Sequence, residues 1–81
     1  MNALILDTET HDVNGYPIEI AHVPCDFNKL GVLQIVDDLL FDKFYSCPEA
    51  ISFAAMAVHH IIESDLIGKP SYNTFRLPQD V

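Results

Sequence analysis

The chain opens with an apolar run that leads directly into acidic residues. The run ends at Leu6 and is followed by Asp7 and Glu9, each flanked by threonine. A short apolar stretch that ends in polar residues predicts a buried strand from Leu4 to Asp7. Because side chains alternate across a strand, Asp7 and Glu9 are expected to project from the same face.

The next stretches predict further strands of an antiparallel sheet. Residues 11–17 contain Asn-Gly and a proline, which predicts a turn. The alternation over residues 18–23 predicts a second strand that forms a hairpin with the first. A turn is expected at 26–31. The segment 32–45 is ambiguous, because its first half could form a helical turn, but residues 40–45 favour a third antiparallel strand.

The second half of the chain predicts short helices. Ser52 is a good N-cap, and the alanine-rich residues 53–60 predict a helix, with one further helical turn at 63–67. Residues 71–81 are expected to form an extended or frayed tail. The pattern predicts a fold of the α/β class, in an α+β-like arrangement of a three-stranded antiparallel sheet followed by one or two short helices.

Length and cysteine content narrow the class of protein. The 81 residues form at most one small domain. No apolar stretch approaches the roughly 20 residues of a membrane span, and the N-terminus lacks the features of a secretory signal. Cys25 and Cys47 show no CxxC spacing, so neither a zinc site nor a disulfide framework is indicated. A cytoplasmic protein with reduced thiols is expected.

The charge argues against direct contact with phosphates. Twelve acidic residues against four basic ones give a net charge of −8. Proteins that bind nucleic acid usually supply Lys and Arg to the phosphates. If this chain acts on nucleic acid, bound metal or a basic surface from another chain must offset the acidity. The four basic residues are scattered: Lys29, Lys43, Lys69 and Arg76.

The acidic pair itself allows two interpretations. Two like charges side by side repel each other, and a cation between Asp7 and Glu9 would remove that repulsion. Hard divalent ions such as Mg²⁺ and Mn²⁺ prefer carboxylate oxygens. The alternative is a strand that leaves the core into a polar turn, with both carboxylates simply in solvent.

Three segments in order resemble a known family. They are residues 6–10, with the sequence Leu-Asp-Thr-Glu-Thr, residues 17–21, and the helical stretch 51–61 followed by Lys69-Pro70. Together they resemble the N-terminal part of the DEDD superfamily of 3′–5′ exonucleases, in the ribonuclease T and exodeoxyribonuclease X branch. The resemblance covers about residues 3–72 and implies a ribonuclease H-like fold.

The resemblance implies an exonuclease site with two divalent ions, Mg²⁺ or Mn²⁺, that hydrolyses DNA or RNA from a 3′ end. Asp7 would bridge both ions, and Glu9 would bind the ion that generates the nucleophile. Alternatives stay open for two of the implied substrate contacts, since Met56 could fill the core and His59 could cap the helix end. The implied substrate-binding residues are Thr8, Thr10, Met56 and His59.

Three other polar residues, within the matching segments or next to them, are interpreted as structural or exposed to solvent. Glu19 could face the edge of the site or a structural partner, and the structural role is favoured. His22 is interpreted as a strand histidine with satisfied hydrogen bonds, and His60 as an exposed residue. None of the three is assigned to the site.

The sequence also departs from the family. An Asn-x-x-Phe-Asp motif and a third motif with a His or Tyr base and a final Asp do not follow Lys69-Pro70, and Asp80 does not substitute for them. Residues 1–81 are therefore interpreted as the N-terminal portion of an exonuclease-like domain that is inactive alone and holds at most one ion weakly. The chain could be part of a longer exonuclease, half of a split nuclease completed by a partner chain, or a non-catalytic binding remnant. An exposed apolar face, and hence self-association, is expected in each case.

Overall fold

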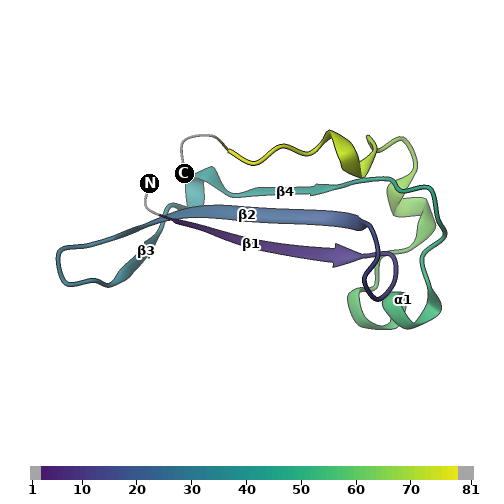
Figure 1. The fold of residues 1–81 in the computed structure, drawn as a ribbon, viewed down its shortest axis with the longest axis horizontal. Coiled ribbons are helices and arrows are strands. Elements are labelled where there is room, and N and C mark those ends of the chain that lie inside the picture. The colour runs from purple at the N-terminus through teal and green to yellow at the C-terminus, as the bar shows by residue number, and fades with distance from the viewer. Residues whose placement is uncertain (1–2, 79–81) are drawn as a thin grey trace.

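The computed structural model describes residues 3–78, and its sheet runs along the longest dimension of the molecule (Figure 1). β2 is central: it pairs antiparallel with β1 on one side and with both β3 and β4 on the other. The α+β fold predicted from the sequence is confirmed, with four strands rather than three. The elements are β1 (Ala3–Thr10), β2 (Pro17–Phe27), β3 (Leu33–Ile35), β4 (Phe41–Phe44) and α1 (Phe53–His59).

The fourth strand forms where the sequence was ambiguous. β2 continues to Phe27, and an Asn28–Gly31 turn reverses the chain into β3. The Asn28 side chain accepts hydrogen bonds from the backbone amides of Leu30 and Val32, at 2.9 and 3.0 Å. Gly31 adopts φ +78°, a conformation that glycine reaches without steric cost. This β2–β3 hairpin extends away from α1 at the opposite end of the sheet (Figure 1).

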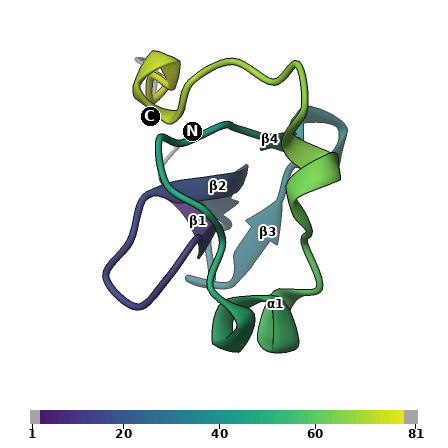
Figure 2. The same cartoon turned by 90° about the vertical axis from the view of Figure 1, so that its right-hand side faces the viewer.

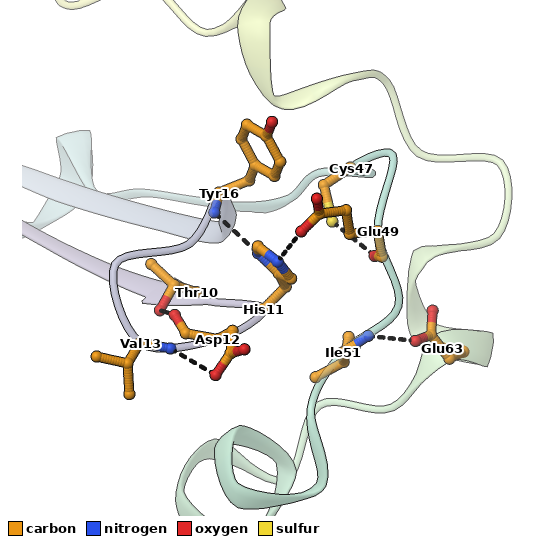
Figure 3. Close-up of polar contacts among 9 residues, drawn as sticks. All are labelled: Thr10, His11, Asp12, Val13, Tyr16, Cys47, Glu49, Ile51 and Glu63. Atoms are coloured by element: carbon orange, nitrogen blue, oxygen red, sulfur yellow. Dashed lines mark hydrogen bonds and ion pairs between the residues drawn. The ribbon is translucent and has the colours of Figure 1, made fainter.

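The turn between β1 and β2 is tied to the loop that precedes α1 (Figure 3). The buried His11 accepts a hydrogen bond from the Tyr16 amide at its Nδ1, 2.9 Å away. Its Nε2 lies 2.7 Å from a carboxylate oxygen of Glu49, to which it donates. The Ser52 amide donates to the His11 carbonyl, at 2.8 Å. These contacts hold the start of α1 beside the end of β1.

The predicted helix and its cap are confirmed. Ser52 Oγ accepts a hydrogen bond from the Ala55 amide, and His60 ends the helix in the left-handed conformation, with φ +61°. The predicted helical turn is present as a 3₁₀ turn, Glu63–Leu66. The core lies between this helical region and the start of β2. Its buried members are Ile18, Ile51, Ile61 and Leu66.

The segment after Pro70 is more ordered than an extended tail. A 3₁₀ turn spans Tyr72–Thr74, and the Tyr72 amide donates to the Ser46 carbonyl, at 2.9 Å. Phe75 packs edge-on against the rings of Phe41 and His22, each 5.9 Å away between centroids. The expectation of an extended or frayed tail is wrong for this part, because aromatic packing fixes it. Residues 79–81 of the expected tail lie outside the described residues.

Several large apolar side chains remain exposed, as the sequence predicted. They include Ile5 and Leu6 of β1, and Phe27, Leu33 and Ile35 of the β2–β3 hairpin. Within residues 3–78, none of the helices has the length and apolar character needed to cross a membrane.

Candidate functional site

The sheet brings together more carboxylates than the sequence suggested. Asp7 is opposite Ala21, which is opposite Asp42, and Glu9 is opposite Glu19. Directly opposed residues of antiparallel strands share a face, so Asp7, Glu9, Glu19 and Asp42 all project from one face of the sheet. The prediction that Asp7 and Glu9 share a face therefore agrees with the strand geometry, and two further carboxylates lie beside them.

Glu19 has the carboxyl of Asp42 as its hydrogen-bond partner on this face. Burial raises the pKa of its carboxyl to about 7, assisted by a hydrogen bond to Asp42 and by the negative charges of Asp42, Glu9 and Asp7. Near neutral pH Glu19 is therefore partly protonated and donates to Asp42. A charge pattern alone could not have shown this, because it depends on the register between β1, β2 and β4.

We expect Glu19→Gln to stabilise the protein at alkaline pH. Between about pH 4.5 and 7 the unfolded chain loses the Glu19 proton while the folded chain keeps it, so the free energy of unfolding falls as pH rises. Partial solvation of the side chain limits the total loss to about 1–2 kcal/mol. Urea unfolding at intervals from pH 4 to 8 should show this slope in the natural protein and a flatter one in Glu19→Gln.

The charge-matched control is Asp38→Asn, which removes a carboxylate from an exposed 3₁₀ turn. It should leave the slope unchanged. An equal flattening in both variants would mean that the net charge of the chain, rather than the surroundings of Glu19, sets the pH dependence.

The acidic face fits a divalent ion only in part. Its donors are carboxylate oxygens, which Mg²⁺ and Mn²⁺ prefer, and the charges of Asp42, Glu9 and Asp7 add to the burial that raises the pKa of Glu19. Among residues 3–78, however, no group of three or more His, Cys, Asp or Glu side chains converges as a metal-binding set. Asp7 and Glu9 would therefore hold an ion with few protein ligands, and water would complete its coordination.

A hollow of about 290 Å³ lies between the end of β1 and α1. Thr8, Glu9 and Thr10 form its β1 side, and Ala55 and His59 contribute from the helix. The structure thus brings three of the predicted substrate residues, Thr8, Thr10 and His59, next to the metal candidate Glu9.

Met56, the fourth predicted substrate residue, lies elsewhere. Its partly buried side chain packs against the core formed by Ile18, Ile51, Ile61 and Leu66, and it is not among the residues that line the hollow. Of the two interpretations of Met56, the structure supports core packing. The reason is helical geometry, because Met56 and the groove-lining Ala54 and Val58 point to different sides of α1.

His59 lines the hollow and makes two hydrogen bonds within the protein. Its Nε2 lies 3.0 Å from the Thr10 carbonyl, and its Nδ1 accepts a hydrogen bond from the Ile61 amide, also at 3.0 Å. A carbonyl only accepts, so Nε2 carries the proton and the ring is the neutral tautomer in this network. Both ring nitrogens are engaged within the protein, which supports the helix-end interpretation of His59.

A second hollow, of about 470 Å³, borders the acidic face on its β4 side. Glu19 and Asp42 line it together with Lys43, Phe44 and the Lys69-Pro70 loop. The loop that completes the family resemblance in the sequence therefore lies next to the carboxylates. Lys69 and Lys43 also place positive charge close to an otherwise acidic surface.

Comparison with solved structures gives a clear match for this arrangement. The chain is similar to a structure described as "Exonuclease X in complex with 5' overhanging duplex DNA", with 34% sequence identity and a TM-score of 0.68. The predicted resemblance to the DEDD exonucleases is confirmed. The match covers 84% of this chain but only 37% of the exonuclease X chain. No protein-family profile matches the chain, and no curated protein sequence matches it significantly.

The match establishes the architecture as a fragment of an exonuclease fold. The chain spans little more than a third of the exonuclease X structure, so most of that fold has no counterpart in these residues. The roles of Asp7, Glu9, Thr8, Thr10 and His59 remain predictions.

Proposed function

We infer that this chain is part of a metal-dependent 3′–5′ exonuclease and supplies one half of its metal site. Asp7 and Glu9 would bind Mg²⁺ or Mn²⁺, and Thr8 and Thr10 would contact the 3′ end of a DNA or RNA strand. The observation that carries this proposal is that Glu9 lines the hollow between β1 and α1 beside Thr8 and Thr10, with Asp7 on the same face of β1 as Glu9. The similarity to exonuclease X supports it.

The residues present favour a chain that is inactive alone. Two carboxylates that hold one ion weakly cannot provide the pair of ions that activates water and stabilises the leaving oxygen. A complementing segment would have to supply further ligands and a base. We propose that these come from a further part of the same protein or from a partner chain, in the cytoplasm, where the free thiols of Cys25 and Cys47 would stay reduced.

A non-catalytic role is the second candidate. The hydrogen bond between Glu19 and Asp42 supports it, because a proton shared by these two carboxyls offsets their mutual repulsion. In that case the acidic face would be a structural feature that an exonuclease-like ancestor left behind.

Metal binding by the isolated chain distinguishes the two candidates. Calorimetric titration with Mn²⁺ should show binding in the millimolar range, and the double variant Asp7→Asn/Glu9→Gln should abolish it, because both proposed ligands lose their charge. The same samples should release no nucleotides from a 3′-labelled single strand. The charge-matched control is Asp37→Asn/Asp38→Asn, which removes two carboxylates from an exposed 3₁₀ turn.

Metal binding and nucleotide release can each give a result that contradicts the proposal. Absence of Mn²⁺ binding, or equal binding by the Asp7→Asn/Glu9→Gln variant, would contradict the metal site and favour the non-catalytic role. Nucleotide release that disappears with Asp7→Asn would contradict the expectation that the chain is inactive alone.

A further inference from the structure

Both ends of α1 are attached to two consecutive residues where β1 ends. At the C-terminal end of the helix, the Nε2 of His59 lies 3.0 Å from the Thr10 carbonyl. At its N-terminal end, the Ser52 amide donates to the His11 carbonyl, at 2.8 Å. Figure 2 views the molecule from this end and shows the chain before α1 passing the turn between β1 and β2. The two attachments therefore join the β1 side of the hollow to its α1 side.

The side chain of His11 is buried at the N-terminal attachment. Its Nδ1 accepts a hydrogen bond from the Tyr16 amide at 2.9 Å, and its Nε2 donates to Glu49 at 2.7 Å (Figure 3). The ring also stacks on that of Tyr16, with 5.3 Å between centroids. Because Nδ1 accepts, the proton lies on Nε2, and each nitrogen has one partner. His11 thus connects the end of β1, the turn into β2 and the loop before α1.

The turn packs so closely on His11 that position 15 requires a glycine. A Cβ atom at Gly15 would overlap the His11 ring and would lie 2.8 Å from the Asp12 amide nitrogen. Neither atom can move far, because the ring is buried and the nitrogen belongs to the backbone. The shape of the turn and the position of the ring therefore depend on each other.

Glu49 acts on the ring through a hydrogen bond rather than through packing. Its side chain is 61% exposed, whereas that of His11 is 7% exposed. Only two residues separate Glu49 from Ser52, and the Ile51 amide between them donates to the carboxylate of Glu63. A loop this short transmits the position of Glu49 to the N-cap of α1.

We propose that His11, bound to Glu49, is a positioning residue that holds the start of α1 beside Glu9 and so shapes the hollow for the 3′ end of a strand. Neither His11 nor Glu49 lines the hollow, so both act through the backbone of Ser52. The 3′ end as ligand rests on the proposed function, whereas the attachment rests on the contacts of His11 alone.

Amide exchange followed by NMR tests the attachment on the full chain without any ligand. In Glu49→Ala the Ser52 amide should exchange about tenfold faster, because the ring loses its acceptor. Glu49→Gln removes the same charge but keeps an acceptor for Nε2, so its Ser52 exchange should stay within about threefold of the natural rate. The Tyr45 amide, which donates to the Ile18 carbonyl in the sheet, should be unchanged in both.

Gly15→Ala tests the same attachment from the other side of the ring. The added methyl group displaces His11 while Glu49 is unchanged, so the Ser52 amide should again exchange about tenfold faster. Faster exchange in both variants would place the effect in the ring, since the two substitutions share no other contact with α1.

The second measurement is the affinity for a strand end. A single strand of about four nucleotides with a free 3′ hydroxyl is titrated in the presence of Mg²⁺ and followed at the Thr8 and Ala55 amides. Glu49→Ala should bind about fivefold more weakly than the natural chain, and Glu49→Gln should bind nearly as well. A role confined to stability would leave the affinity of the folded molecules unchanged.

Several results would overturn the positioning role. Ser52 exchange that is unchanged in Glu49→Ala would do so, and so would equal acceleration at Tyr45, which indicates a general loss of stability. Equal effects of the alanine and glutamine variants would assign the role to the charge of Glu49 instead of its bond to His11. Equal strand affinity in the natural chain and Glu49→Ala would mean that the attachment does not shape the hollow. A natural chain that binds no strand would contradict the proposed function instead, and the exchange at Ser52 would still decide the attachment.

Discussion

Replacing Ile18 with alanine is expected to lower the free energy of unfolding by about 3–4 kcal/mol. Ile18 is fully buried at the start of β2 and packs with Ile51, Ile61 and Leu66, so the change removes apolar contacts and leaves a cavity. A domain of this size is stable by only about 4–12 kcal/mol, and the variant should therefore lose much of its margin. Urea unfolding followed by circular dichroism measures the change.

The matched control for this variant is Ile67→Ala. It removes the same atoms from a side chain that is 78% exposed, and the expected change is below about 0.5 kcal/mol. If both isoleucines gave similar losses, the core around Ile18 would be less closely packed than the structure shows. A small loss at Ile18 alone would mean that the surrounding side chains collapse into the cavity.

Most of the fold that these side chains stabilise can be predicted from local sequence patterns. The alternation of residues 18–23 indicates a strand in any context, and Ser52 before an alanine-rich run marks the start of a helix because its hydroxyl satisfies a free amide. β3 could not be predicted, because the hydrophobic pattern of three exposed residues is too short to distinguish a strand from a loop. The packing of Phe75 depends on Phe41, far away in the sequence, and no local signal encodes it.

The candidate site is likewise predictable from the sequence only where it depends on a single strand. The shared face of Asp7 and Glu9 follows from alternation within a single strand, so the sequence was sufficient to predict it. The position of Glu19 opposite Glu9 depends on the register of the β1–β2 hairpin, and that of Asp42 depends on a strand pairing that crosses the chain. The acidic face is therefore a tertiary feature, and local sequence patterns do not predict it.

His59→Ala is expected to open the hollow between β1 and α1 and to lower the free energy of unfolding by about 2–3 kcal/mol. The substitution leaves the Thr10 carbonyl and the Ile61 amide without their partner, at the junction where the helix meets the end of β1. Thr8 and Thr10 would then lose their fixed distance from α1. Urea unfolding measures the loss of stability, and amide exchange at Thr10 and Ile61 locates it.

His60→Asn is the control, because it changes the adjacent exposed histidine and asparagine tolerates the left-handed backbone of that position. It should cost less than about 0.5 kcal/mol. The His59→Ala variant should still bind Mn²⁺, since Asp7 and Glu9 are unchanged. When the proposed complementing segment is also present, the variant should bind a 3′ end more weakly than the natural chain does. If 3′-end binding fell without any loss of stability, His59 would contact the substrate directly, and the helix-end interpretation would be wrong.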